Sequence, residues 1–233
     1  MKVLSLETSG RCGSLAAINA NGPDSAVLES HQLPADLRTA QTLLSGIEKL
    51  LAQSDWSVQE LDLVCVACGP GSFTGLRIGV TVAKTLAYAT GAALVGVNTL
   101  AAMAAGVDQP FDRLWCILNA QREELFTVCF PREWQVGSAS HPETQILSIE
   151  QWLSQLRAGD TVCGSTVKAL GDRLPAEARV LAGSYGSAHA IAVGQIGISA
   201  MHLGDTIDPM QLVPQYYRKS AAEEKADSGD GPR

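Results

Sequence analysis

The segment from Gly69 to Gly79 contains the residues whose types and spacing could most directly do chemistry. It reads Gly-Pro-Gly-Ser-Phe-Thr-Gly-Leu-Arg-Ile-Gly and follows the apolar run 61–67, which predicts a buried strand. Free backbone N–H groups at a strand–helix turn suit a phosphate or carboxylate, but glycines also let another backbone approach closely. The residues of this turn, structural or anion-binding, are Gly69, Gly71, Ser72, Thr74 and Gly75. We interpret the turn as structural.

The glycine segment matches neither of two common phosphate-binding fingerprints. It is not a P-loop, because no Gly-Lys-Ser or Gly-Lys-Thr closes it. Its Gly-x-Gly-x-x-x-Gly spacing is near the dinucleotide fingerprint, but residues 95–98, where a ribose-binding carboxylate is expected, include no acid. The residue pattern of the glycine segment alone therefore predicts no particular nucleotide.

Metal and nucleophile chemistry have little support in the sequence. The four histidines, at positions 31, 141, 189 and 202, fall in separate predicted elements without ligand spacing. Cys65 and Cys68 form a Cys-x-x-Cys, but Cys65 lies in the apolar run and no second pair completes four ligands. No Gly-x-Ser-x-Gly elbow occurs. We therefore predict no metal site and no catalytic residue.

The elements that must position these residues form two similar α/β halves. The first half has strands over 2–8, 13–20, 25–31, 61–67 and 93–97, and helices over 37–53, 74–89 and from Thr99. The second half has strands over 114–118, 125–130, 144–148 and 161–163, and helices over 149–156, 166–174 and 188–203. We predict two domains, 1–104 (completed by a returning segment, 205–220) and 105–204, followed by a flexible polar tail, 221–233.

Composition limits the compartment and the partners. The chain has 233 residues, 46% of them hydrophobic, which suffices for one large or two small domains. It shows neither an apolar run long enough to span a membrane nor a signal-peptide pattern, so we expect a cytoplasmic protein with reduced cysteines. Its net charge is −7 and its Lys and Arg residues are scattered singly. Nucleic acid, if involved, should be held mainly by a partner.

Three motifs, in order along the chain, resemble one protein family. The start Val-Leu-Ser-Leu-Glu-Thr-Ser, residues 3–9, is similar to the family's Ile-Leu-x-Ile-Asp-Thr-Ser, with Glu7 in place of the usual Asp. Residues 119–126, Asn-Ala-Gln-Arg-Glu-Glu-Leu-Phe, are similar to its Asp-Ala-Arg-Arg-Gly-Glu-Val-Tyr, and residues 214–218 match its Pro-x-Tyr-x-Arg. With the glycine segment, these motifs resemble the TsaB (YeaZ) family of tRNA threonylcarbamoyladenosine biosynthesis.

The resemblance implies a fold and leaves open whether the chain binds ATP. The fold is that of the actin, sugar-kinase and Hsp70 ATPase superfamily, which is built from duplicated β-β-β-α-β-α units. Glu7, Thr8 and Ser9 are then either a remnant nucleotide loop or a plain hairpin with an acidic end. In the second half only Cys163-Gly164-Ser165 resembles a phosphate loop, and it is short. ATP binding stays open, with an ATP-dependent small-molecule kinase or ATPase as the rival function.

The resemblance also implies a role without catalysis. The catalytic relative TsaD has a His-x-x-x-His pair after the strand that follows its glycine loop. The matching positions here are Thr99 and Met103, which are not a plausible metal pair. A member of this family is expected to be a noncatalytic scaffold without a cofactor. It would bind a TsaD-like protein and a TsaE-like ATPase, form homodimers when alone, and meet tRNA only through the complex.

The helix pattern suggests where a partner would bind. Gly75, Gly79 and Ala83 form a stripe of small residues, which permits close helix packing. This stripe could pack on the protein's own sheet, but a second apolar side lies beside it, so we expect one of the two sides to face a partner. The predicted surface comprises Leu37, Ala40, Leu44, Ile47, Leu51, Gly75, Ile78, Gly79, Val82, Ala83 and Leu86.

Overall fold

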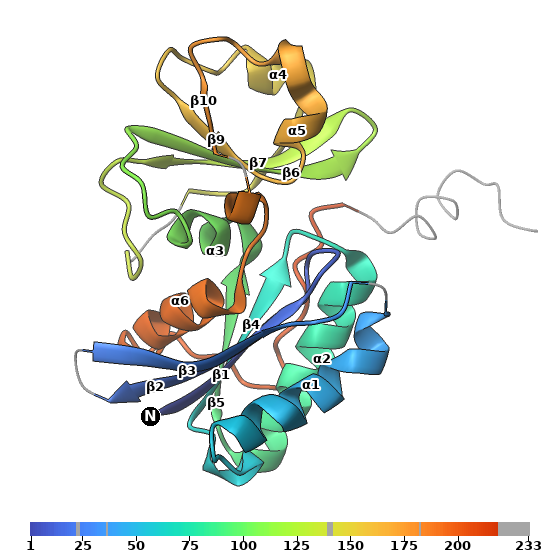
Figure 1. The fold of residues 1–233 in the computed structure, drawn as a ribbon, viewed down its shortest axis with the longest axis vertical. Coiled ribbons are helices and arrows are strands. Elements are labelled where there is room, and N and C mark those ends of the chain that lie inside the picture. Colours follow the sequence, from blue (N-terminus) through green and yellow to red (C-terminus); the bar gives the residue numbers. More distant parts are fainter. Residues whose placement is uncertain (22–23, 36, 139–141, 182, 219–233) are drawn as a thin grey trace, which may run out of the picture.

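The computed structural model describes residues 1–21, 24–35, 37–138, 142–181 and 183–218. They form two five-stranded mixed sheets, one in each half of the molecule, with helices packed against both (Figure 1). The predicted tail, 221–233, lies outside the described residues. In the part of the chain that is described, no helix combines the length and apolar character needed to cross a membrane.

The first sheet has the strand order β3-β2-β1-β4-β5. Its strands are β1 (Lys2–Glu7), β2 (Ser14–Asn21), β3 (Asp24–Gln32), β4 (Leu63–Gly69) and β5 (Ala93–Asn98). Neighbours β1, β2 and β3 run antiparallel, whereas β4 is parallel to β1 and β5 is parallel to β4. The predicted strand over 61–67 is therefore displaced by two residues and ends at Gly69, inside the glycine segment.

The second sheet repeats this topology in the order β10-β9-β6-β7-β8. Its strands are β6 (Arg113–Gln121), β7 (Glu124–Pro131), β8 (Gln145–Ser148), β9 (Thr161–Cys163) and β10 (Arg179–Leu181). Again the first three strands are antiparallel, and the last two are parallel to the first. The predicted duplication is confirmed, although the sequence pattern missed β10, which is only three residues long.

The helices after the third and fourth strands are long in the first half and short in the second. The first half has α1 (Thr39–Gln53), α2 (Phe73–Thr90) and α3 (Thr99–Ala105), and the second has α4 (Ile149–Leu153), α5 (Val167–Leu170) and α6 (Ala190–His202), with short 3₁₀ turns at Val58–Glu60, Gly171–Arg173 and Gly183–Gly186. The predicted helix over 166–174 is thus a short helix followed by a 3₁₀ turn. Helix α2 ends at Gly91, whose left-handed φ of 77° suits glycine at a helix terminus.

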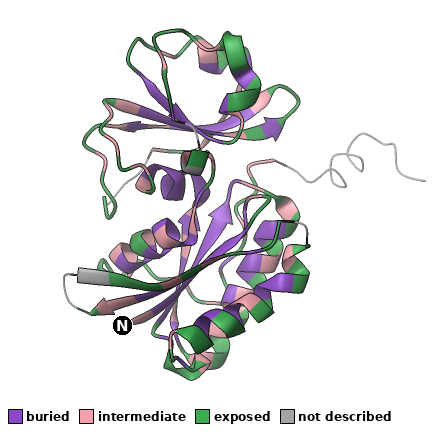
Figure 2. Ribbon diagram, viewed as in Figure 1, coloured by how far each residue is buried: buried purple, intermediate pink, exposed green. Residues whose placement is uncertain are grey.

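The cores follow from the alternation of side chains along the strands. Leu4 and Leu6 point to the side covered by α1 and α2, whereas Val3 lies in the core on the opposite side. That opposite core also includes Leu114 and Phe130 of the second sheet, together with α3 and α6. The inner faces of the two sheets therefore share one apolar core, and Figure 2 shows the buried strands of both halves in purple.

Helix α6 corrects the predicted domain boundary. The sequence assigned residues 188–203 to the second domain, but α6 packs on β1, β2, β4 and β5 of the first sheet (Figure 1). Its glycines make this approach close: a Cβ at Gly194 would lie 2.4 Å from the Ile18 Cδ1 atom, and one at Gly197 would lie 2.1 Å from the Cys65 sulfur. Helix α6 thus belongs to the first half in space.

The C-terminal strap, which we define as Ile207–Arg218, returns to the first half. The Ile207 N–H donates to the Leu94 carbonyl at 2.9 Å, and the Gln215 N–H donates to the Cys68 carbonyl at 2.7 Å. Between them, the buried Leu212 side chain packs in the core beneath α2. The strap therefore lies along the first half before it reaches the second.

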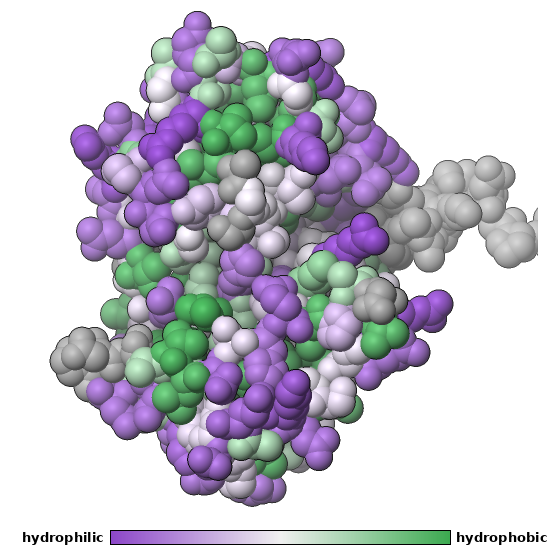
Figure 3. Space-filling model, in the orientation of Figure 1, coloured by the Kyte–Doolittle hydropathy of each residue, from purple (hydrophilic) through white to green (hydrophobic). Residues whose placement is uncertain are grey.

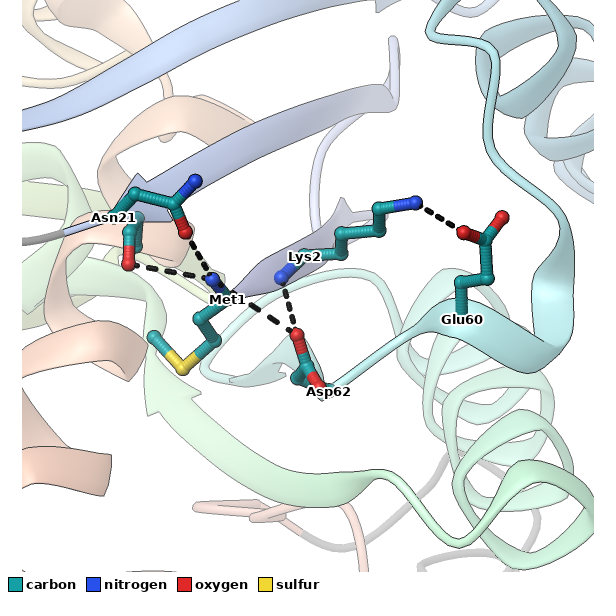
Figure 4. A network of polar contacts seen from close by, with 6 residues as sticks. Met1, Lys2, Asn21, Glu60 and Asp62 are labelled. Carbon is teal, nitrogen blue, oxygen red and sulfur yellow. Dashed lines mark hydrogen bonds and ion pairs between the residues drawn. The ribbon is translucent and has the colours of Figure 1, made fainter.

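Polar contacts hold the start of β1 in place (Figure 4). The N-terminal ammonium donates to the Asn21 side-chain oxygen at 2.5 Å, and the Lys2 backbone N–H donates to Asp62 at 2.6 Å. The Lys2 ammonium pairs with Glu60 at 2.5 Å. These contacts lie at the beginning of β1, whereas Glu7 and the following loop lie at its other end.

Candidate functional site

Two loops that the sequence singled out meet at one edge of the first sheet. Strands β1 and β4 are parallel neighbours, so Glu7-Thr8-Ser9 and the glycine segment emerge side by side. The Ser72 N–H donates to the Ser9 carbonyl at 2.7 Å, and the Thr8 hydroxyl donates to the Gly75 carbonyl at 2.9 Å. The two loops are therefore bonded to each other.

The glycines of the segment allow this contact. A Cβ at Gly71 would lie 2.6 Å from the Ser9 carbonyl oxygen, and one at Gly75 would lie 2.0 Å from the Thr8 carbonyl oxygen. A Cβ at Gly79 would lie 2.1 Å from the Thr8 hydroxyl oxygen. Contacts within the chain thus account for the small residues along this side of α2, in line with a structural turn.

The N-terminus of α2 is also capped from within the chain. The Ser72 hydroxyl accepts a hydrogen bond from the Gly75 N–H at 3.2 Å, which satisfies one of the helix's free donors. Thr74 is exposed. At Gly69, φ is +133° and a Cβ would lie 2.5 Å from the Gln215 carbonyl oxygen, so this glycine is needed where the strap passes.

Glu7 is a fully buried carboxylate at the end of β1. One of its oxygens accepts hydrogen bonds from the Ser9 N–H, at 2.7 Å, and from the Ser9 hydroxyl. The other oxygen has no hydrogen-bond partner among the described residues. Desolvation raises the pKa of Glu7, and hydrogen bonds from Ser9 and the field of His189 oppose this only in part.

The second half has a neutral counterpart to Glu7. At the end of β6, the Asn119 side-chain oxygen accepts a hydrogen bond from the Gln121 N–H at 2.7 Å, as Glu7 does from Ser9. The following turn is unusual, because Gln121, Arg122 and Glu123 all have left-handed φ values, of 68°, 52° and 58°. The Arg218 guanidinium donates to the Ala120 carbonyl and pairs with Glu124 beside this turn.

An interdomain cleft of about 710 Å³ lies between these loops. We use this name for the cavity lined by Ser9, Gly10, Arg11, Pro70, Gly71, Ser72, Phe73, Leu76, Leu118, Asn119, Ala120, Gln121, Phe126, Ser165, Gln215, Tyr216, Tyr217 and Arg218. The described residues that line it include two arginines and no Asp or Glu. Loops of both halves and the strap therefore line one opening, and none of its described lining residues is acidic.

Aromatic rings cluster on the strap side of the interdomain cleft. Phe73 and Tyr216 stack with ring centres 4.5 Å apart and planes 25° apart. The Arg77 guanidinium lies 5.0 Å from the Phe73 ring centre. Tyr217 lies 6.1 Å from Phe126, and its hydroxyl accepts a hydrogen bond from the Asn98 amide. Sequence reasoning missed these residues, although the Pro-x-Tyr-x-Arg motif around Tyr216 and Arg218 marked the segment.

The predicted partner surface divides into buried and accessible residues. Ile47, Leu51, Gly75, Gly79 and Ala83 are buried within the chain, so they cannot directly face a partner, which corrects that part of the prediction. The accessible residues are the exposed Leu37, Ala40 and Leu44 and the half-buried Ile78, Val82 and Leu86. Helices α1 and α2 contact each other along the chain's outer side (Figure 1).

No group of His, Cys, Asp and Glu side chains in the described residues has the arrangement of a metal site. Thr99 and Met103 are only 1% and 2% exposed, because both lie on α3 in the core shared by the two sheets. Cys65 and Cys68 are likewise buried, and burial raises the pKa of both thiols, to about 12 for Cys68.

Sequence comparisons point to one biosynthetic process. The model of the family described as "TsaD: tRNA N6-adenosine threonylcarbamoyltransferase" matches residues 35–159. The tRNA threonylcarbamoyladenosine biosynthesis protein TsaB of Bacillus subtilis (strain 168) is 27% identical, over 97% of this chain and 97% of its own. The tRNA N6-adenosine threonylcarbamoyltransferase of Desulfovibrio desulfuricans is 41% identical, but over only 36% of this chain and 24% of its own.

A solved structure supports the fold. YeaZ from Pseudomonas aeruginosa superposes with a TM-score of 0.76, over 92% of this chain and 99% of that one, at 23% sequence identity. The likeness covers both halves. At this identity it establishes the arrangement of strands and helices and no more.

Proposed function

The chain belongs to the TsaD-type sequence family and, within it, to the TsaB (YeaZ) group, and from this premise we propose that it is a scaffold in tRNA threonylcarbamoyladenosine formation. In this proposal it binds a TsaD-type transferase through the accessible faces of α1 and α2. A TsaE-type ATPase joins the pair, and the chain forms homodimers through the same faces when the transferase is absent. The complex works in the cytoplasm.

One observation supports this docking surface above the others. Leu44 of α1 is 62% exposed and Leu37, just before α1, is 51% exposed, although Ile47 and Leu51, one and two turns after Leu44, are buried. Large exposed apolar side chains next to half-buried ones favour a protein partner. Figure 3 shows green, hydrophobic residues among purple, hydrophilic ones over the side of the molecule that bears α1 and α2. Such a mixed surface suits a partner that can also leave.

Two features support a role without catalysis of its own. Thr99 and Met103, at the positions of the transferase's histidine pair, are buried in the core and have no accessible ligand atoms. The loops that would hold phosphate in an ATPase are bonded to each other through Ser72 and Ser9, and Ser72 caps α2. Hydrolysis of ATP by this chain alone is therefore not part of the proposal.

The test is co-purification with the TsaD-type protein of the same organism, using two matched variants. Leu44→Glu should lose the partner at least about tenfold while keeping the wild-type melting temperature, because Leu44 is exposed in the free chain. Leu203→Glu is the control, since Leu203 is 64% exposed and follows α6, not α1 or α2. Equal capture of both variants would refute the docking surface. Threonylcarbamoylation of tRNA by this chain without the TsaD-type protein would refute the scaffold.

A further inference from the structure

We propose that the interdomain cleft holds a single-stranded segment of RNA, with Arg11 and Arg77 beside its phosphates and Tyr216 stacked on one of its bases. This inference rests on the proposed function, which gives the chain a place in a complex that acts on tRNA. It assigns to the chain a direct contact with the nucleic acid.

The charge around the cleft is the first argument. The chain as a whole carries −7, and its basic residues are scattered in sequence. In space, Arg11 from the β1–β2 loop and Arg218 from the strap line the same opening, whose described lining residues include no Asp or Glu. Arg77 contacts Phe73, a residue of the same lining. The fold therefore gathers cations that an overall charge count hides.

These arginines differ in whether they already pair with an acidic residue of the chain. Arg218 is paired with Glu124, so it anchors the strap and adds little net charge. Arg11 is exposed and makes no hydrogen bond or ion pair to another described residue. Arg77 is also exposed, and its recorded contact is with the Phe73 ring. Two guanidinium groups are thus available for phosphate oxygens, which they match in geometry.

The aromatic rings are the second argument. Tyr216 stacks on Phe73 and yet remains 44% exposed, so part of the ring at the opening is accessible to a ligand. Accessible aromatic rings beside cations are the usual means by which proteins hold single-stranded nucleic acid without reading its sequence. The side chains of Gln121 and Gln215 line the same cavity, and although the Gln215 side-chain oxygen accepts a hydrogen bond from the Tyr217 hydroxyl at 3.0 Å, its amide N–H groups could meet base edges. A double helix would leave no base face to stack.

The loops favour RNA over a free nucleoside triphosphate. A triphosphate needs a cradle of several backbone N–H groups, but here Ser72 N–H is bonded to Ser9 and Gly75 N–H to the Ser72 hydroxyl. An RNA strand needs only separate contacts, one for each phosphate. An acidic peptide would satisfy the arginines but would leave the Tyr216 ring without a planar partner. The combination of cations and ring therefore selects the nucleotide strand.

The experiment measures the binding of a fluorescein-labelled heptaribonucleotide to the full chain by anisotropy. With two phosphate contacts on a single strand, affinity should fall about sevenfold between 50 and 200 mM salt. Arg11→Gln should weaken binding and reduce that salt effect to about threefold. Tyr216→Ala should weaken binding at least about fivefold, and Tyr216→Leu, which keeps the bulk, should also do so. Arg132→Gln, an exposed arginine paired with Asp112, is the control and should bind normally.

Three results would overturn the inference. The first is that the wild-type chain binds no RNA. The second is that the Arg11 and Tyr216 variants bind RNA as tightly as the wild-type chain does. The third is that equimolar ATP or a glutamate-rich peptide displaces the RNA completely. Capture of the TsaD-type protein by Arg11→Gln separates this inference from the proposed function. Arg11→Gln should retain that partner. If the chain captures the TsaD-type protein but binds no RNA, only the RNA-binding inference is refuted. If the wild type binds RNA but captures no TsaD-type protein, only the docking surface is refuted.

Discussion

The two halves share a strand topology and differ in what covers it. Their five strands follow the same order, and the helices after the third and fourth strands occupy equivalent places in the two units. In the first half these are α1 and α2, of 15 and 18 residues, and in the second they are α4 and α5, of 5 and 4 residues. Only the first half therefore presents long helices, which is where the proposed partner surface lies.

The difference shows which constraints belong to the fold and which to a site. The glycine that ends β4 and the glycine after β9 have similar backbones, with φ of +133° at Gly69 and +138° at Gly164. A Cβ at either would collide with a carbonyl, at 2.5 Å and 1.9 Å. The two glycines admit different neighbours, the strap at Gly69 and β6 at Gly164. Gly75 and Gly79, in contrast, occur only in the first half, where a long helix packs on the β1–β2 loop.

The largest expected effect comes from adding a side chain at Gly75, where α2 packs on the β1–β2 loop. Gly75→Ala should destabilise the chain by about 3 kcal/mol or more, because its Cβ would overlap the Thr8 carbonyl and neither backbone has room to move. The control is Gly186→Ala, where the nearest atom lies 3.9 Å from the Cβ, and it should stay within about 0.5 kcal/mol. Urea denaturation measures both. Equal stability of the two variants would mean that the loops do not lock together.

Arg218 ties the strap of the first half to the second half. Arg218→Met should cost about 1–2 kcal/mol, because it leaves the part-buried Glu124 and the Ala120 carbonyl without their donor. Arg218→Lys should recover only part of this, since one ammonium cannot replace the planar guanidinium at both acceptors. Thermal unfolding of the three proteins tests it. Full recovery by Lys would reduce the role of Arg218 to charge alone.

The comparison of Glu7 with Asn119 asks whether the first half tolerates a neutral side chain at the end of β1. Since burial raises the pKa of Glu7 above 4.5 in the folded chain, its charging opposes folding as pH rises from 4.5 through that raised pKa. Glu7→Gln, which imitates Asn119, should therefore be more stable relative to wild type at pH 7 than at pH 4. Melting temperatures of both proteins across this range give the difference. A constant difference would show that the pKa of Glu7 is the same in the folded and the unfolded chain, which would contradict the prediction.

The smallest effect is expected at the first half's outer edge. Lys2 and Ser57 lower the pKa of Glu60 from 4.5 to about 2, so the ion pair stabilises the fold above pH 4.5 and is lost as pH falls towards 2. Both side chains are partly exposed, at 29% and 48%, so solvent screens the pair. Glu60→Gln should lower the melting temperature by about 1–2 °C at pH 7 and not at all at pH 2. A larger shift at pH 7 would indicate cooperation with Asp62.

The sequence predicted a helix or strand well where the spacing of its apolar residues and the length of the segment indicated the same element. The apolar residues at helical spacing in 37–53, of which Ile47 and Leu51 are buried, and the apolar run of β4 each identify an element, because one side or both sides are buried. Strand β10 was missed since three residues give no period, and Arg179 is exposed. The sequence could not place α6, because its apolar residues fit either sheet and only the fit of Gly194 over Ile18 decides.

The candidate sites were harder to predict for a different reason. The small-residue stripe of α2 was visible, but nothing in the sequence says that Thr8, 67 residues before Gly75, fills it. The interdomain cleft combines Arg11, Phe73 and Tyr216 from three distant segments, and single arginines in a sequence give no sign of such a gathering. Tertiary packing creates these sites, whereas periodicity reports only on neighbours along the chain.

The position of α6 and the strap has a consequence for how the protein is made. Strand β5 completes the first sheet at Asn98, yet the helix that covers its inner face ends only at His202, about 100 residues later. At synthesis rates of roughly 5–20 residues per second, that face stays uncovered on the ribosome for about 5–20 seconds. During this interval Ile18, Cys65 and Val95 have no permanent cover. The nascent first half thus leaves this apolar face without its helix until the last segment emerges, and only then completes its native core.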